Sequence, residues 1–361
     1  MDDYDDGGEQ EIGPVAFARY HLGDLHRRGV IVPELMCRQL LYRNGFHSLA
    51  GEPDSGKTTL AYWFAAELLG EGGRVMIFDE EQGPEQADER LLALGAEQED
   101  IDERTFYYPF PGRKWTRTDV TALSLEVAEA KPDLVIFDSA GAFMAMAGLD
   151  ENNPGDCTRW YKTVMQPLTR NADLPTSVLL IDHDTKAQSG GNGASSRYAR
   201  GSGSKLGIVD VQFKVQLIQP FSRSMDGQVK LVVSKDRRGY MHPRRYRINV
   251  SRKLNIEFES AAAAQAADRE EMIEQLTATQ SKVYQVLDGT PMRKQEIANR
   301  VTMRFKYNVR PETVGKVMAV LVDMGIAVAV AEGGGRGHEA RWVLAGSNPQ
   351  TMFEPGEGGR P

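Results

Sequence analysis

Residues 46–60 read FHSLAGEPDSGKTTL. An apolar run ends at Gly51, four residues intervene, and Gly56 opens the segment GKTTL. A loop of the form G-x-x-x-x-G-K-T directs successive backbone N–H groups at phosphate oxygens, and the start of the next helix adds positive potential. The stretch therefore predicts a strand, a phosphate-binding loop and a helix, in that order.

This loop predicts ATP and Mg²⁺ as ligands. Lys57 is expected to reach the β- and γ-phosphates, and the Thr58 hydroxyl is expected to ligate Mg²⁺. An accidental turn with Gly and Lys is the alternative, but an apolar run precedes this loop and the helical stretch KTTLAYWFAAELLG follows it. The residues expected to contact the nucleotide are Gly51, Glu52, Pro53, Asp54, Ser55, Gly56, Lys57, Thr58 and Thr59.

Three further short apolar runs follow, separated by amphipathic stretches. They read RVMIFD, DLVIFD and SVLLID, and each ends in an acidic residue. Runs that are apolar at nearly every position are typical of strands buried on both faces of a parallel sheet. After Val209 the runs alternate apolar with polar residues, which indicates antiparallel strands at one sheet edge. The predicted fold class is α/β, a mostly parallel sheet flanked by helices.

The sequence divides into five segments. Residues 15–258 are expected to form the α/β core, with a helical lead-in at PELMCRQLLYR, and residues 259–274 an Ala- and Glu-rich linker helix. Residues 275–345 contain three helical segments and a hairpin with a Gly-rich tip, which predicts a winged helix-turn-helix. Residues 1–14 are acidic and residues 346–361 are Gly-rich, so both predict disordered tails.

Composition narrows the class of protein. Hydrophobic residues make up 41% and charged residues 26%, as in globular domains. No apolar run reaches the roughly 20 residues of a membrane span, and the acidic start is unlike a secretory signal. Two cysteines form no disulfide framework, so we expect a cytoplasmic protein without a membrane partner. The net charge is −8, yet residues 275–345 carry ten Lys or Arg against six Asp or Glu, a balance compatible with DNA contact.

Acidic residues follow two of the apolar runs. In RVMIFDEEQG, Glu81 and Glu80 are candidates for the base that polarises the attacking water, with Asp79 in reserve. The alternative for each one is a solvated acid at a strand end. In DLVIFDSAGAF, Asp138 is expected to hold Mg²⁺ through water, because it follows the phosphate loop by 80 residues in the expected order.

A polar segment follows the last of these runs, SVLLID. His183 is expected beside the γ-phosphate, where it would sense the phosphate state and pass it to the next loop. That loop, KAQSGGNGASSRYARGSGSK, is rich in Gly and Ser, and a cationic loop of this kind suits contact with single-stranded DNA. A flexible linker is the alternative. Its candidate DNA contacts are Lys186, Arg197, Arg200 and Lys205.

The C-terminal module offers a second candidate for DNA contact. In RPETVGKVMAVLVDMG, Arg310 and Lys316 lie where a recognition helix meets duplex DNA, and Arg336 lies at the hairpin tip. A winged helix that binds protein is the alternative.

Residues 30–258 resemble the RecA-like ATPases, specifically the RepA- and DnaB-type hexameric replicative helicases. The resemblance is carried by the phosphate loop, FDEEQG, IDHDTK and VVSKDRRGY. It implies that Glu81 rather than Glu80 is the base and that His183 is the sensor. It also implies that Lys235 and Arg237, with Arg238 less favoured, reach the γ-phosphate bound by a neighbouring subunit. A basic hairpin turn at the surface is the alternative.

The resemblance implies an ATP-dependent helicase or translocase that moves on single-stranded DNA during replication, as a homohexamer. The catalytic set would then be Glu81, Glu80, Lys57, His183, Lys235 and Arg237. One alternative is a DNA-dependent ATPase switch, such as a recombinase, loader or initiator, that does not unwind duplexes. Another is a winged-helix regulator whose nucleotide site only gates DNA binding. The chain departs from the DnaB-type pattern in having a short N-terminal region, and from the RepA type in carrying a winged helix.

Overall fold

The structure is a computed structural model. It describes residue 23 and residues 32–109, 113–169, 176–183, 203–330 and 340–345. The chain divides into two compact units, Met1–Arg244 with Asn249–Ile256, and Arg245–Ile248 with Glu257–Pro361.

The structure contains a nine-stranded sheet in the order β11-β10-β9-β8-β3-β7-β6-β4-β5, and strands β3 to β9 of this sheet lie in the first unit. Its central strands are parallel, and β8 pairs in parallel with β3 but antiparallel with β9. The predicted mostly parallel α/β sheet is confirmed, and only the expectation of antiparallel pairing for all runs after Val209 needs correction, at β8. The strands are β3 (Phe46–Gly51), β4 (Val75–Asp79), β5 (Thr105–Pro109), β6 (Leu134–Asp138), β7 (Ser177–His183), β8 (Val211–Gln219), β9 (Gly227–Asp236), β10 (Arg245–Val250) and β11 (Ile256–Phe258).

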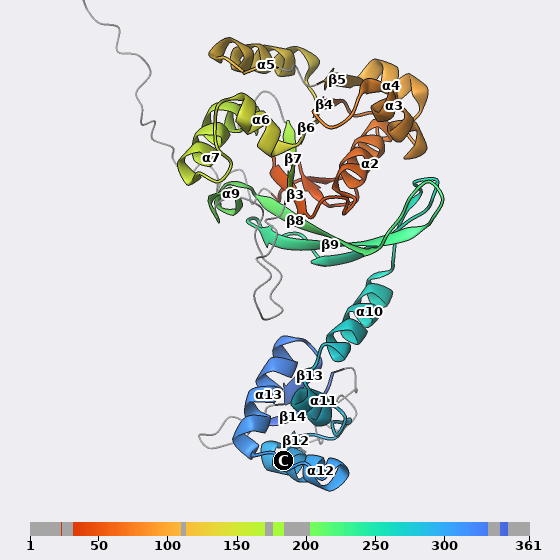
Figure 1. Cartoon of the computed structure of the whole chain (residues 1–361), viewed down its shortest axis with the longest axis vertical. Coiled ribbons are helices and arrows are strands. Elements are labelled where there is room, and N and C mark those ends of the chain that lie inside the picture. The colour runs from red at the N-terminus through yellow and green to blue at the C-terminus, as the bar shows by residue number, and fades with distance from the viewer. Residues whose placement is uncertain are drawn as a thin grey trace, which may run out of the picture. The chain divides into compact units, whose positions relative to one another are not determined.

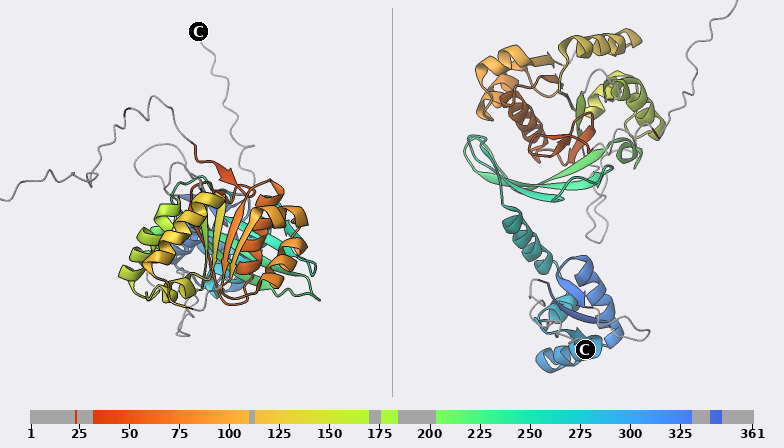
Figure 2. Two further views of the ribbon diagram at one scale, coloured as in Figure 1. Left: turned by 90° about the horizontal axis from the view of Figure 1, so that it is seen from above. Right: turned by 180° about the vertical axis from the view of Figure 1, so that it is seen from behind.

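Helices cover both faces of this sheet (Figures 1 and 2). One face carries α2 (Lys57–Gly70), α3 (Pro84–Ala93) and α4 (Gln98–Arg104). The other carries α5 (Arg117–Ala130), α6 (Ala140–Met146), α7 (Pro154–Trp160), the π-helix η1 (Tyr161–Met165) and α8 (Gln166–Thr169), and α9 (Gly203–Ile208) packs beside α7. On this second face, side chains of the helices enclose the aromatic rings of Phe78 and Phe137, whose centroids lie 4.9 Å apart.

The helix predicted at PELMCRQLLYR is wrong. Its described residues form a short antiparallel hairpin, β1 (Leu35–Met36) and β2 (Leu41–Tyr42). Residues 37–39 between them have positive φ values of 49°, 52° and 64°, outside the helical region. Met36, Leu41 and Tyr42 are buried, so packing of the hairpin on the core outweighs the helical spacing of the apolar residues.

The second unit contains three helices and a hairpin in the described parts of residues 275–345, together with one short strand, β12, that the sequence analysis did not predict. Helix α10 (Ala261–Glu274) precedes α11 (Ala278–Tyr284), α12 (Lys294–Phe305) and α13 (Pro311–Asp323), and the strands β12 (Met292–Arg293), β13 (Ala327–Val330) and β14 (Arg341–Leu344) form an antiparallel sheet in the order β12-β14-β13. Its core is formed by Val283, Ile297, Val301, Val314, Met318, Leu321 and Ile326. Assignment to the winged-helix class stays a prediction.

No helix in the described parts of the chain is both long enough and apolar enough to cross a membrane.

Candidate nucleotide site

The phosphate loop joins β3 to α2 through a backbone that two positions bend sharply. Gly56, the N-cap of α2, has φ 91°, and Asp54 has φ 58°. A side chain is also excluded at Gly51, because a Cβ there would lie 2.5 Å from the carbonyl oxygen of Val215. The two glycines of the motif thus serve different needs, one a left-handed turn and the other a close approach of strand β8.

Lys57 lies over this loop. Its side chain is buried, and Nζ donates a hydrogen bond to the carbonyl oxygen of Glu52 at 2.6 Å. The ammonium is therefore held within the turn that is expected to enclose phosphate oxygens.

Thr58 and Asp138 form the pair expected at the metal position. Thr58 Oγ1 donates to Asp138 Oδ2 at 2.9 Å, which joins the first turn of α2 to the end of β6. The other carboxylate oxygen, Asp138 Oδ1, is buried and receives no hydrogen bond from any described residue. Burial, together with the charge of Glu81, raises the pKa of Asp138 to about 7. A bound cation would give Asp138 Oδ1 a partner and would reduce the free-energy cost of burying the carboxylate charge.

These residues fit Mg²⁺ as it is held beside nucleotide phosphates. The ion needs only one or two protein oxygens there, with phosphates and waters completing its shell. The described residues contain no group of three or more His, Cys, Asp or Glu that could hold a metal by itself.

Glu81 and His183 meet at the same end of the sheet. His183 Nε2 lies 3.4 Å from Glu81 Oε1, and His183 is paired with Gly51 in the parallel register of β3 and β7. The hydrogen bond from His183 is the main cause of a lowered Glu81 pKa, which burial opposes and Lys57 reinforces. The Glu81 carboxylate is therefore ionised at neutral pH, as a general base must be.

The neighbouring acids face elsewhere. Glu80 Oε1 accepts a hydrogen bond from Ser139 Oγ at 3.0 Å, and burial raises the Glu80 pKa. Asp79 is buried and accepts hydrogen bonds from the Tyr62 hydroxyl at 2.5 Å and from the backbone N–H of Glu81 at 2.9 Å. The reserve assignment of Asp79 as a base is therefore wrong, because its oxygens hold the turn that presents Glu81.

The loop opens onto a cavity of about 380 Å³, and a second hollow of about 430 Å³ shares three lining residues with it. Of these three, the sequence predicted Thr59 but not Arg90, which comes from α3, or Phe221, which comes from the turn between β8 and β9. The Phe221 ring lies 3.1 Å from a Cβ built on Gly56. No local pattern marks either side chain, because only the fold brings them to the loop. The first cavity is lined by Pro53, Asp54, Ser55, Gly56, Lys57, Thr58, Thr59, Glu81, Gln82, Arg90, Ile181, His183 and Phe221.

Lys235 and Arg237 lie at the opposite end of the strands. Lys235 pairs with Gln212 on β8, and Gln212 pairs with Ser48, three residues before the end of β3. At about 3.3 Å per residue, this places Lys235 roughly 10 Å along the strand from the end that bears the phosphate loop, and Arg237 lies two residues further away. Neither cation is brought to the phosphate loop of its own chain.

These cations differ in how the structure holds them. Arg237 is 43% exposed and donates hydrogen bonds to the carbonyl oxygens of Gly207 and Ile208. Burial, followed by the charge of Arg237, lowers the pKa of Lys235. Arg238 lies 4.9 Å over the ring of Tyr42, an internal contact that agrees with its lower rank as a candidate.

Of the proposed DNA contacts, Lys205 is corrected by the structure. Its side chain is only 11% exposed, and its ammonium lies 2.9 Å from Glu151 and 3.0 Å from Asp182. The ammonium that was expected to contact DNA phosphate is therefore paired with two carboxylates of its own chain. Arg310, the N-cap of α13, and Lys316 on that helix are both exposed. Lys186, Arg197, Arg200 and Arg336 lie outside the described residues.

Comparison with known proteins gives a match that lies mostly in the first half of the chain. No curated protein matches the sequence. A family model described as AAA domain matches residues 31–189, which span the phosphate loop, Glu81, Asp138 and His183 but not Lys235 or Arg237. This match indicates a nucleotide-dependent ATPase in general terms. Over residues 31–189, the chain is similar to the AAA domain family.

Proposed function

We propose that the chain is an Mg²⁺-dependent ATP hydrolase. The observation that carries the proposal is that Thr58, Glu81 and His183 line one cavity, while Thr58 also bonds to Asp138, whose other carboxylate oxygen is buried and satisfied by no described residue. Lys57 would bind the β- and γ-phosphates, while Thr58 directly and Asp138 through water would hold the metal. Mg²⁺, when bound, supplies positive charge to the phosphate oxygens.

Glu81 is the general base of this proposal. Its ionised carboxylate orients the attacking water and accepts its proton, and His183 holds the carboxylate by the 3.4 Å contact. The second hollow, with Arg90 and Phe221 at its border, offers room beside the phosphates for the nucleoside.

The reaction would be completed by a neighbouring copy of the chain. Positive charge on the transferring phosphoryl group stabilises its transition state. Lys235 and Arg237 have the required charge, but they lie at the far end of the strands from their own loop. A homo-oligomer, as a hexameric ring, would bring them to the next subunit's nucleotide.

We further propose that this ring is a helicase or translocase acting on single-stranded DNA in replication. The support is the resemblance of its motifs, together with the exposed cations Arg310 and Lys316 of the second unit, which suit duplex DNA. A DNA-dependent switch without unwinding remains the competing function, since the site described above would serve both.

The test is ATP hydrolysis with and without single-stranded DNA, followed by strand displacement on a forked duplex. The wild-type chain is expected to hydrolyse ATP faster with DNA and to displace the strand, and Lys57→Ala to do neither. Stimulated hydrolysis without displacement would favour the switch. Hydrolysis no faster than that of Lys57→Ala would reject the ATPase itself.

A further inference from the structure

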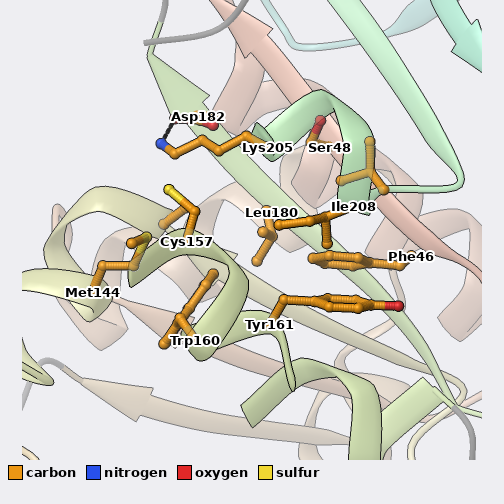
Figure 3. A pocket seen from close by; sticks show the side chains of 12 residues that line it. Phe46, Ser48, Met144, Cys157, Trp160, Tyr161, Leu180, Asp182, Lys205 and Ile208 are labelled. Carbon is orange, nitrogen blue, oxygen red and sulfur yellow. Dashed lines mark hydrogen bonds and ion pairs between the residues drawn. The ribbon is translucent and has the colours of Figure 1, made fainter. Parts of the chain in front are cut away.

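A buried ion cluster lies beside the nucleotide site, on the side of the sheet that carries α6 and α7. It consists of Lys205 on α9, Asp182 on β7 and Glu151 in the α6–α7 connection. Lys205 Nζ lies 3.0 Å from Asp182 Oδ1 and 2.9 Å from Glu151 Oε2, and the three side chains are 11%, 5% and 21% exposed. Figure 3 shows Lys205 reaching Asp182 across one end of a small cavity lined by Cys157, Trp160 and Tyr161.

Asp182 links this cluster to the sensor histidine. The oxygen that receives Lys205, Asp182 Oδ1, also accepts the backbone N–H of His183 at 3.0 Å. The His183 ring contacts Glu81 through Nε2, whereas its Nδ1 is buried without a hydrogen-bond partner among the described residues. The orientation of the ring therefore depends on the backbone that Asp182 holds.

Glu151 links the cluster to the strand that bears the metal ligand. Its Oε2 lies 2.9 Å from the place of a Cβ on Gly141, three residues after Asp138. A Cβ at position 141 would displace the Glu151 carboxylate, so the glycine leaves room for it beside the start of α6. Lys205 thus bridges two elements, one that ends in His183 and one that begins after Asp138.

Stability alone is a weak reason for such a cluster. The desolvation of buried charges largely offsets their attraction, and well-packed apolar residues often serve equally well. Burial raises the pKa of Asp182, and the charge and hydrogen bond of Lys205 only partly oppose this rise. The lysine and the His183 N–H share one oxygen of this carboxyl group, Oδ1. In Lys205 itself, the two carboxylates outweigh burial and raise the pKa.

We propose that Lys205 is a positioning residue for ATP hydrolysis, acting through Asp182 and His183 on the Glu81 carboxylate. This inference rests on the proposed ATPase. Its consequence is that α9 and the catalytic pocket are mechanically joined, because a shift of Lys205 would release Asp182 and with it the His183 backbone.

The kinetic test compares Lys205→Met with Lys205→Arg and with Lys114→Met, which removes an exposed lysine of the same unit. Lys205→Met is expected to lower kcat by about 10- to 100-fold with little change in KM, since small misplacements of catalytic groups cost rate at this scale. Lys205→Arg should recover part of the loss, and Lys114→Met should match the wild type. If Lys205→Met folds poorly, Lys205→Met with Glu151→Gln keeps the net charge of the cluster and should show the same loss of kcat.

Coupling to His183 separates positioning from general damage. If Lys205 acts through His183, the double variant Lys205→Met with His183→Gln should have the same kcat as His183→Gln alone. If the two substitutions act independently, the fold-losses in kcat of the single variants should multiply in the double variant. Wild-type kcat in Lys205→Met, or multiplying effects in the pair, would overturn the inference while leaving the ATPase intact.

A measurement that does not require ATP hydrolysis tests the positioning role separately from the proposed ATPase. The imidazole NMR signals of His183, assigned by their loss in His183→Gln, are expected to shift in Lys205→Met and to stay in place in Lys114→Met. Unmoved signals would reject the positioning role, whether or not the wild-type chain hydrolyses ATP.

Discussion

At the scale of single residues, three adjacent acids show how environment assigns roles. Asp79 is the last residue of β4, and Glu80 and Glu81 follow it. Asp79 accepts hydrogen bonds from Tyr62 and from the backbone of the turn, and Glu80 accepts one from Ser139. Of the three, only Glu81 lines the cavity. Their order in the sequence cannot distinguish them, since all three are acids at a strand end. The resemblance to RecA-like helicases favoured Glu81, and of the three acids this is the one that lines the cavity.

Substitution of Glu81 tests this assignment. Glu81→Gln removes the base but keeps the side-chain shape, so we expect kcat for ATP to fall by about 10²- to 10⁴-fold. Nucleotide affinity, measured with a fluorescent ATP analogue, should change little. Glu80→Gln is the matched control, because its carboxylate faces Ser139. A larger loss of kcat in Glu80→Gln than in Glu81→Gln would reverse the assignment.

His47, on the strand before the phosphate loop, predicts a pH dependence of stability. Its Nε2 accepts the Tyr42 N–H at 2.9 Å, and its Nδ1 lies 3.2 Å from the Val178 carbonyl oxygen, so the ring is held neutral. Burial lowers its pKa from 6.5 to about 4. The unfolded chain therefore binds more protons between these values, and the stability that His47 contributes is full above pH 6.5 and lost as the pH falls toward 4.

This contribution is measurable by urea unfolding at pH 7, 5.5 and 4.5. Between the first and last pH, the wild type should lose about 2 to 3 kcal/mol more than His47→Gln, from roughly 1.4 kcal/mol per pKa unit. Parallel pH profiles of the two proteins would show that His47 does not titrate with folding.

At the scale of elements, strand register assembles the site. Because β3, β7, β6 and β4 are parallel, their carboxyl ends meet, and Gly51 is paired with His183 as Asp79 is with Asp138. The sequence predicted these strands because buried parallel strands are apolar throughout. It predicted a helix at residues 33–43, where a hairpin forms because the burial of Met36, Leu41 and Tyr42 outweighs the local preference.

Two glycines at the ends of neighbouring elements form a matched pair for a stability test. A Cβ on Gly51 would meet the Val215 backbone at 2.5 Å, whereas one on Gly70, at the end of α2, would meet nothing within 4 Å. Gly51→Ala should therefore destabilise the protein by about 1 to 3 kcal/mol and weaken ATP binding. Gly70→Ala should be neutral or stabilise it by up to about 1 kcal/mol. The change in stability of each variant is measured from its denaturant unfolding midpoint. Equal effects at the two positions would contradict the close approach of β8 to Gly51.

At the scale of the whole molecule, the proposed function requires more than one chain. The phosphate loop and the cations Lys235 and Arg237 lie at opposite ends of the same strands. The sequence resemblance implied this division between subunits, and the register of β8 and β9 keeps both cations away from the phosphate loop of their own chain.

Mixing of variants tests the shared site. Lys57→Ala and Arg237→Ala should each be inactive, and Arg237→Ala should still bind nucleotide. When the two are mixed, some interfaces pair an intact Lys57 with a neighbour's intact Arg237, so hydrolysis should reappear. Normal hydrolysis by Arg237→Ala alone, or no recovery in mixtures that mass measurement shows to be co-assembled, would argue against the ring.

The sequence by itself determined the phosphate loop, the apolar strands and the polar residues at their ends. These features depend on glycine spacing and local periodicity, which neighbouring residues set. Only the tertiary structure decided that Glu81 faces the cavity, that Arg90 and Phe221 border it, and that Lys205 is enclosed by Asp182 and Glu151. Each of those outcomes depends on side chains that are far apart in the sequence. They bury one another and interact through their charges only after the sheet has formed.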